Sequence, residues 1–170
     1  MTPEAAAAVR DALVDMIQGE HAATCQTLAA VTEAGKTYKP DPKSRTPWDI
    51  ATHLATADAW LLDSIVAGVF HFDPEAQKQA MAQFKTAEDL VAFYKTAIPP
   101  RLAALKALTG DTLTRTLDFF GVMQMPAVSF IGFVNNHSIH HRGQLAASLR
   151  AIGARVPNIY GPSADAAPAQ

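Results

Sequence analysis

The segment between Pro126 and Gly153 repeats apolar residues every three or four positions, which is the spacing of one face of an α-helix. The residues on this face are Phe130, Phe133, Val134, Leu145 and Ile152, together with His137 and His141. Side chains four residues apart lie one turn apart on the same side of a helix, so these two imidazoles can reach a single metal ion. Because an unpaired imidazole is costly to bury on an apolar face, a metal ion would satisfy both rings at once.

Three other segments begin with the residues that favour a helix N-terminus, a threonine cap followed by proline or acidic residues. These starts are Thr2-Pro3-Glu4, Thr46-Pro47-Trp48-Asp49 and Thr86-Ala87-Glu88-Asp89. Glycines mark the expected ends of the three helices, at Gly35, Gly68 and Gly110. Four long amphipathic helices without a convincing strand pattern predict an all-α fold, a four-helix bundle.

The stretches outside these helices are expected to be mostly irregular. Residues 69–85 are predicted to be irregular or briefly helical, and residues 115–124 to form a connector with some extended character. Pro99-Pro100 predicts a kink in the third helix, because proline lacks a backbone donor. Residues 1–153 are expected to form a single domain, and residues 154–170, rich in alanine and proline, an irregular C-terminal tail.

The composition narrows the classes of function. A chain of 170 residues with a formal net charge of −2 lacks the basic surface expected of a protein that binds nucleic acid or an anionic membrane. Cys25 is the only cysteine, so no internal disulfide can form and nothing indicates an oxidising compartment. The N-terminus resembles no signal peptide and no apolar run is long enough to span a bilayer, so we expect a cytoplasmic protein.

His53 lies on the apolar face of the second predicted helix, beside Leu54, Ala57 and Trp60. Helical bundles build metal sites from residues that face inward on adjacent helices, so His53 can join His137 and His141. Three imidazoles with an open fourth position are typical of catalytic zinc sites. Nickel, iron and manganese are alternatives, since imidazole also binds other first-row metals. Such a metal could lower the pKa of a bound water or activate a thiolate.

Each histidine also has a simpler interpretation. His53 alone on an apolar face is typical of a core histidine hydrogen-bonded to a neighbour, and the pair His137 and His141 is only a short motif. His140 lies on the flank of the apolar face, where it would support the site or face solvent. A ligand pair of His137 and His140 is geometrically feasible but second choice.

Several other residues are candidates for parts of the site. Gln144 shares the histidine face and could line a pocket or serve helix packing, and Tyr94 is another candidate polar neighbour. Asp49 could be a carboxylate ligand, although capping of its helix is the simpler role. Asp58 is expected to point away from His53 into solvent, and Cys25 to be a small buried residue. Two cations, Arg142 and Arg101, are the nearest candidates to bind an anionic substrate.

Four stretches of the chain resemble the DinB/YfiT-like family of metalloenzymes, in the expected order and spacing. They are Thr46-Pro47-Trp48-Asp49-Ile50-Ala51-Thr52-His53-Leu54, Met125-Pro126, His137-Ser138-Ile139-His140-His141-Arg142-Gly143-Gln144-Leu145 and Val156-Pro157-Asn158-Ile159-Tyr160-Gly161-Pro162-Ser163-Ala164-Asp165. The resemblance implies a four-helix bundle of up-down-down-up order that often forms homodimers. It also implies one divalent metal ion held by three histidines, which correspond to His53, His137 and His141.

Characterised members of that family include thiol-dependent transferases and isomerases that use bacillithiol, mycothiol or glutathione. The resemblance therefore favours a metal-dependent S-transferase or hydrolase acting on a small-molecule substrate, with a water or a thiol sulfur at the open position. Gln144, His140 and Tyr94 are the candidate neighbours of that ligand. Two alternatives are a non-enzymatic bundle with a structural metal or a ligand-binding role, and a hydrogen-bonded histidine cluster without metal.

Overall fold

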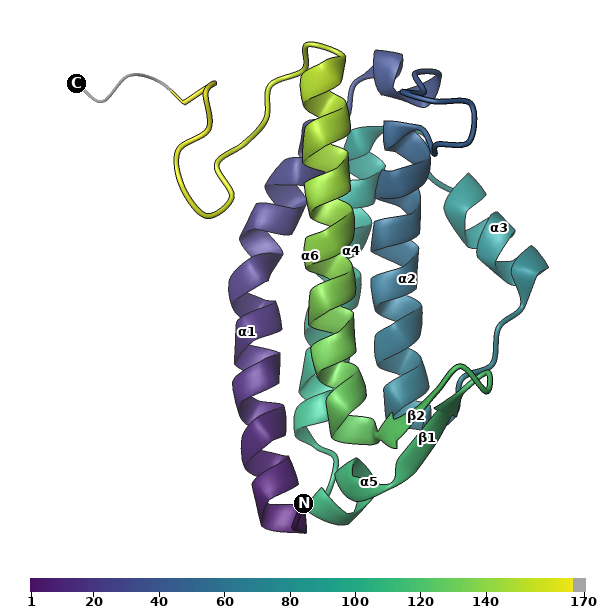
Figure 1. Ribbon diagram of the computed structural model, residues 1–170, viewed down its shortest axis with the longest axis vertical. Coiled ribbons are helices and arrows are strands. Elements are labelled where there is room, and N and C mark those ends of the chain that lie inside the picture. Colours follow the sequence, from purple (N-terminus) through teal and green to yellow (C-terminus); the bar gives the residue numbers. More distant parts are fainter. Residues whose placement is uncertain (167–170) are drawn as a thin grey trace.

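The computed structural model describes residues 1–166 and is mostly helical (Figure 1). These residues form six α-helices, a short 3-10 helix and one two-stranded antiparallel sheet. The elements in chain order are α1 (Pro3–Ala29), η1 (Glu33–Lys36), α2 (Pro47–Ala67), α3 (Pro74–Ala82), α4 (Ala87–Lys106), α5 (Gly110–Thr114), β1 (Thr116–Phe119), β2 (Met123–Pro126) and α6 (Ala127–Ala151). No helix in the part of the chain described is both long and apolar enough to cross a bilayer.

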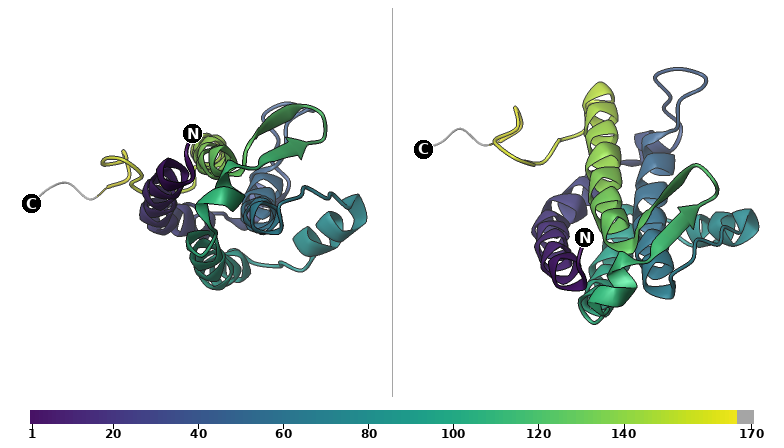
Figure 2. Two further views of the ribbon diagram at one scale, coloured as in Figure 1. Left: turned by 90° about the horizontal axis from the view of Figure 1, so that it is seen from below. Right: turned by 60° about the horizontal axis from the view of Figure 1, so that its bottom comes forward.

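The core lies among the four long helices. Helix α2 packs against α4 and α6, and α1 packs against the same two helices from the other side. Figure 2, seen from below, shows this arrangement, with α3 and the β1–β2 hairpin outside it and beside α2. Because two long helices and α3 all contact α2, this helix is buried on more than one face. Its residues are therefore the best placed to carry a buried functional site.

The predicted helix starts at Thr46 and Thr86 are confirmed by their hydrogen bonds. The Thr46 hydroxyl accepts the Asp49 amide at 3.0 Å, and the Asp49 carboxylate accepts the Thr46 amide at 3.2 Å. Thr86 and Asp89 form the same reciprocal box at the start of α4. Both boxes satisfy backbone donors that have no partner inside the helix, and the first fixes the end of α2 that leads to His53.

The predicted helix ends are less accurate than the starts. Gly68 caps α2 as expected, with the positive φ of 76° that glycine adopts without strain. Helix α1 instead ends at Ala29, before Gly35, and α4 ends at Lys106, so that Gly110 begins α5. Segment 69–85 contains the short helix α3, in agreement with a briefly helical connection.

The fold is not purely helical as predicted, because residues 116–126, expected to be a connector with some extended character, form a two-stranded hairpin. Phe119 pairs with Met123, and the loop between them places both Phe120 and Gly121 at positive φ. The Asp118 carboxylate accepts the Gly121 amide and holds the turn. Strands of four residues carry too little alternation to be recognised, and an aromatic residue at positive φ is not a usual hairpin signal.

Pro99 and Pro100 do not interrupt helix α4, which runs through both. Both prolines are exposed, so the backbone carbonyls that lose a donor lie near solvent. The Arg101 guanidinium also donates to the Ala97 carbonyl at 2.8 Å. At the end of the chain, α6 is followed by residues 154–166 without helix or strand, and residues 167–170 of the predicted tail lie outside the described part.

Candidate metal centre

Three histidines from two adjacent helices come together where α2 and α6 pack. His53 lies on α2, and His137 and His141 lie one turn apart on α6. One ring nitrogen from each of the three lies within 4.8 Å of the others, and the Nε2 atoms of His53 and His137 are 3.4 Å apart. All three side chains are partly buried. The spacing of four residues therefore brings the rings to one point, as the sequence predicts.

The two histidines of α6 are each oriented by a hydrogen bond at Nδ1. His137 Nδ1 lies 3.0 Å from Asp58 Oδ1, and His141 Nδ1 lies 2.9 Å from Gln144 Oε1. Both oxygens are acceptors, so each Nδ1 carries the hydrogen and each Nε2 keeps its lone pair. Metal-binding histidines commonly donate their other ring nitrogen to a carboxylate or carbonyl in this way.

Asp58 is not solvated, which corrects the expectation from the sequence. It is 2% exposed, and its second oxygen accepts the Tyr94 hydroxyl hydrogen at 2.9 Å. Asp58 therefore joins α2 to His137 on α6 and to Tyr94 on α4. Tyr94 contacts this carboxylate rather than the three histidines. Burial, and to a smaller extent the negative charge of Asp58, raises the pKa of the Tyr94 phenol well above its usual value. The phenol thus stays protonated and able to donate.

The environment keeps two of the rings in the neutral form that binds metals. Burial, together with the nearby Arg45 and the other two histidines, lowers the pKa of His53 to about 3. Burial, together with His137, likewise lowers the pKa of His141 to about 4. A neutral imidazole offers a lone pair, so these rings need no deprotonation before they coordinate a metal at neutral pH.

The hydrogen bonds also decide how well a metal fits this donor set. An Nε2 hydrogen on His53 could donate to His137, which would satisfy that pair without metal. It would leave the Nε2 lone pair of His141 without a donor, because no bond to that atom occurs within residues 1–166. A cation shared by the three nitrogens would satisfy all of them, so the three histidines fit a divalent metal ion.

Two cavities meet at this centre. The first, of about 450 Å³, extends from His53 and His137 along four aromatic rings, which belong to Trp60, Phe72, Phe119 and Phe133. The second, of about 560 Å³, lies on the side of His141 and Gln144 and is lined by Ser44 and Ser148 as well. Only His53 and Arg45 line both. The histidines are therefore accessible from two cavities.

Two other polar candidates from the sequence lie at this centre in supporting positions. Asp49 lines the aromatic cavity, but its carboxylate accepts the Thr46 amide, so its role is capping. His140 is exposed and stays outside the group of three that can hold a metal. The choice of His141 over His140 as the partner of His137 agrees with this geometry.

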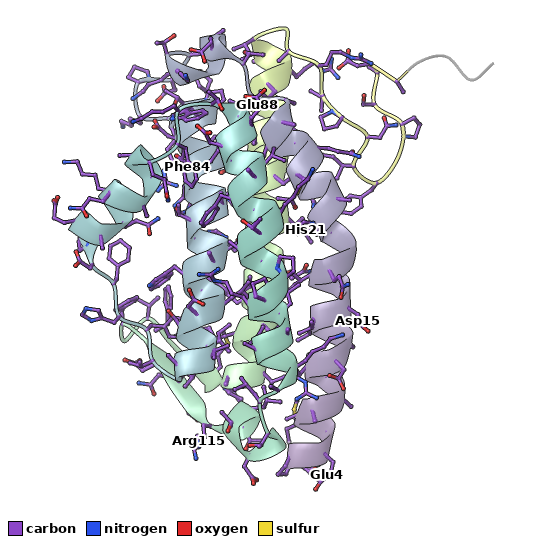
Figure 3. The ribbon with its side chains drawn as sticks, turned by 180° about the vertical axis from the view of Figure 1, so that it is seen from behind. Glu4, Asp15, His21, Phe84, Glu88 and Arg115 are labelled. Atoms are coloured by element: carbon purple, nitrogen blue, oxygen red, sulfur yellow. The ribbon has the colours of Figure 1, made fainter. Side chains whose placement is uncertain are left out.

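The remaining histidines and the cysteine lie elsewhere. His21 lies on α1 on the side of α4 (Figure 3), with Nε2 3.3 Å from the Tyr94 carbonyl and Nδ1 3.9 Å from Cys25 Sγ. Cys25 is buried as expected, and burial raises its pKa, which makes it a poor nucleophile. His71 is exposed, and its carbonyl accepts the Trp60 indole hydrogen.

Neither arginine proposed from the sequence reaches the centre. Arg142 is 1% exposed and donates to Glu20, Thr24 and the Tyr160 hydroxyl, so it joins α6 to α1 and to the C-terminal segment. Its role is structural. Arg101 pairs with Asp63 at 2.7 Å near the surface.

Sequence reasoning missed two kinds of residue at this site. Asp58 is the only charged residue between Asp49 and Asp63, and such an isolated charge in an apolar helix could have marked it as buried and paired. Arg45 and the cavity aromatics Phe72 and Phe119 come from connections and the hairpin, where helical periodicity carries no signal.

Comparison with known proteins identifies the family and agrees with the fold. The sequence model of the DinB family matches residues 5–169. The uncharacterised Bacillus subtilis protein YrdA is 38% identical over 79 residues, which are 46% of this chain and 47% of YrdA. The match thus spans about half the length of that relative. The chain is a mostly helical protein with three clustered histidines between α2 and α6. It belongs to the DinB family.

Three solved structures share this fold. The DinB-like protein YjoA from Bacillus subtilis has a TM-score of 0.66 and 22% identity, covering 89% of this chain and 99% of YjoA. A DinB-like protein from Bacillus cereus ATCC 10987 has a TM-score of 0.67 and 26% identity, covering 85% and 95% of the two chains. A mycothiol-dependent maleylpyruvate isomerase has a TM-score of 0.59 and 13% identity, covering 80% of this chain and 60% of the isomerase.

Proposed function

We propose that His53, His137 and His141 hold one divalent metal ion, and that the protein is a metal-dependent enzyme of the thiol-dependent S-transferase type. The observation that carries the proposal is the convergence of the three rings, with Nδ1 of His137 and of His141 already bound to an acceptor. Zinc or nickel is the best match to three imidazoles, and iron or manganese is the alternative. Such an ion supplies a Lewis acid that lowers the pKa of a coordinated thiol or water.

The residues around the histidines would hold this centre in place. Asp58 keeps the ring of His137 in one orientation, and Tyr94 in turn fixes the carboxylate of Asp58. Gln144 has the same role for His141 but lies at the surface, where water competes for its amide. The aromatic rings beside His53 give that side of the centre an apolar lining. These hydrogen bonds and the apolar lining favour a catalytic metal site over a structural one.

Two observations favour an enzyme over a bundle with a structural metal. A structural zinc site normally has four protein ligands, whereas the described residues supply a group of three. Cavities of about 450 and 560 Å³ also adjoin the histidines, within the size range of small-molecule sites. The fold shared with a mycothiol-dependent isomerase supports a low-molecular-weight thiol as the second substrate. Hydrolysis by an activated water is the second candidate reaction.

The helix order and assembly implied by the resemblance are part of the proposal. We propose a four-helix bundle of up-down-down-up order; the starts of α1 and α6 at the bottom of Figure 1, and of α2 and α4 at the top, support it. Homodimer formation, a cytoplasmic location and the lack of nucleic-acid and membrane partners stay predictions. Sedimentation of the purified protein measures the first of these.

Substitution of His137 tests the proposed function. His137→Ala should lose the metal and any thiol-transfer activity found by screening bacillithiol, mycothiol and glutathione against electrophiles, while helical content by circular dichroism is retained. Stoichiometric metal in the variant would overturn the ligand assignment. Metal in the wild type without activity toward any thiol, together with no exchange of water at the ion, would favour the structural alternative.

A further inference from the structure

One cation beside the histidines has no partner within residues 1–166. Arg45 is exposed and lines both cavities, a property that it shares only with His53. Five other arginines donate to carboxylates or to a carbonyl, namely Arg10, Arg101, Arg142, Arg150 and Arg155. We infer that Arg45 binds a single negative charge on the substrate, such as a carboxylate. The inference rests on the proposed function and names the charge of its substrate.

The position of Arg45 in the chain is unfavourable for a cation. It directly precedes Thr46, the N-cap of α2, and the N-terminus of a helix carries a partial positive charge. An apolar residue at this position often packs against the fourth residue of the helix, which here is Ile50. Arg45 instead places a charge at the cavity that Ile50 also lines. Departures from local rules of this kind are expected at functional sites.

The backbone next to Arg45 is held firmly although the side chain is exposed. Thr46 and Pro47 are buried, and the capping box between Thr46 and Asp49 fixes the start of α2. His53 follows on the same helix, about two turns after the cap. One rigid element therefore sets the position of Arg45 relative to His53, which is the condition for a residue that orients a ligand.

No carboxylate beside the histidines is free to neutralise Arg45. Asp49 accepts the Thr46 amide, and the two oxygens of Asp58 accept from Tyr94 and lie against His137. Burial, and after it the charge of Arg45, lowers the pKa of His53, so this cation acts on a proposed metal ligand. A divalent ion at the histidines would add more positive charge. An anionic group on the substrate would compensate it and could pair with the guanidinium.

The segment that leads into Arg45 is also basic. Residues 36–45 contain four cationic residues and one acidic residue, whereas the whole chain has a formal net charge of −2. Lys39 and Lys43 are exposed, so they attract anions from solvent toward this end of the bundle. Of the four cations only Arg45 lines the two cavities, which matches a ligand with one negative charge.

Two probes of similar shape and different charge test the inference by calorimetry, on protein incubated with zinc. Naphthalene-2-sulfonate is an anion that coordinates metals weakly, and methyl 2-naphthyl sulfone is its uncharged counterpart. The naphthalene ring suits the aromatic lining of the first cavity. Wild type should prefer the sulfonate. Arg45→Gln should weaken the sulfonate about fivefold and leave the sulfone within about twofold. Arg45→Lys, which keeps the charge, should lose less.

Arg115→Gln is the matched control for Arg45→Gln. Both arginines are exposed and neither has an ion pair within residues 1–166, but Arg115 lines neither cavity and lies at the opposite end of the bundle (Figure 3). Arg115→Gln should leave the binding of both probes unchanged. Equal loss of the sulfonate in the two variants, equal effects of Arg45→Gln on both probes, or no preference of wild type for the sulfonate would overturn the inference.

Salt and heat distinguish a bound charge from a structural role of Arg45. Added salt should weaken sulfonate binding more in wild type than in Arg45→Gln, because exposed charges are screened. Arg45→Gln should melt no lower than wild type, since it removes a cation from the N-terminus of α2. A lower melting temperature with both probes lost together would overturn the inference in favour of a structural role.

Metal content measured on the same samples separates this inference from the proposed function. Arg45→Gln should retain the metal, because the hydrogen bonds of the three histidines do not involve Arg45. Full metal content without charge-selective binding would overturn the role of Arg45 and leave the metal centre standing. Charge-selective binding that depends on Arg45, in a protein that takes up no zinc, would overturn the proposed function and leave the anion site standing.

Discussion

One stretch of α6 supplies two polar networks that differ in how their polar atoms are satisfied. On one side, Arg142 donates to Glu20 on α1 and to Tyr160 in the C-terminal segment, and the Tyr160 hydroxyl donates to Glu20. Charges and donors there find protein partners. On the other side, His137 and His141 each satisfy one ring nitrogen and direct the second toward other nitrogens.

The difference separates a structural network from a binding site. A network that is fully satisfied by the protein has no remaining affinity for a ligand, and removal of one member leaves a buried charge unpaired. Lone pairs that converge without donors favour a cation. Consecutive residues His141 and Arg142 therefore have unrelated roles, because adjacent side chains on a helix point about 100° apart and so contact different neighbouring elements.

The largest effect on stability is expected from Arg142→Ala. The variant removes the charged partner of Glu20, which keeps only the Tyr160 hydroxyl as a side-chain donor within residues 1–166, and breaking a pair whose guanidinium is 1% exposed costs about 3 kcal/mol. The melting temperature should fall by about 6–12 °C. Arg150→Ala, which removes an exposed pair with Asp165, is the control and should cost less than about 1 kcal/mol. Equal shifts in the two variants would contradict a structural role specific to Arg142.

Asp58→Asn should act on metal affinity. The amide cannot replace the carboxylate that accepts both from His137 and from Tyr94, so the His137 ring loses its orientation. Metal affinity should fall by about 10–100-fold in competition with a chromogenic chelator. Asp63→Asn, on the exposed side of the same helix, should have no effect. An unchanged affinity in Asp58→Asn would remove this residue from the centre.

Tyr160→Phe should have a smaller effect on the network of Arg142, Glu20 and Tyr160. It removes the hydroxyl that accepts from Arg142 and donates to Glu20, and one such group contributes about 1 kcal/mol. The melting temperature should fall by about 2–4 °C with metal affinity unchanged. A loss of metal in this variant would show that the two networks are coupled, contrary to the comparison above.

The smallest effect is expected from Gln144→Ala. Gln144 is exposed, so water can replace its hydrogen bond to His141, and metal affinity should fall by less than about tenfold. The same chelator competition measures it. If metal affinity fell as much as in Asp58→Asn, burial of Asp58 and exposure of Gln144 would not explain how strongly each residue stabilises its histidine.

Local signals in the sequence were sufficient for the helices and the histidines. Reciprocal caps such as Thr46 with Asp49 depend only on residues three apart, and His137 and His141 depend only on helical spacing. The burial of Asp58 could not be predicted in this way, because it depends on α4 and α6 enclosing α2 from two sides. The aromatic cavity escaped prediction for a similar reason, since Phe72 and Phe119 reach Trp60 only after the loop and the hairpin fold back.

Metal content by mass spectrometry, on protein purified without an affinity tag, tests the central claim most directly. Wild type, His140→Ala and His141→Ala are compared, because these neighbouring histidines differ in that only His141 belongs to the group of three. We expect about one divalent ion per chain in wild type and in His140→Ala, and none in His141→Ala. Equal metal in all three, or none in wild type after addition of zinc, nickel and manganese, would contradict the three-histidine centre.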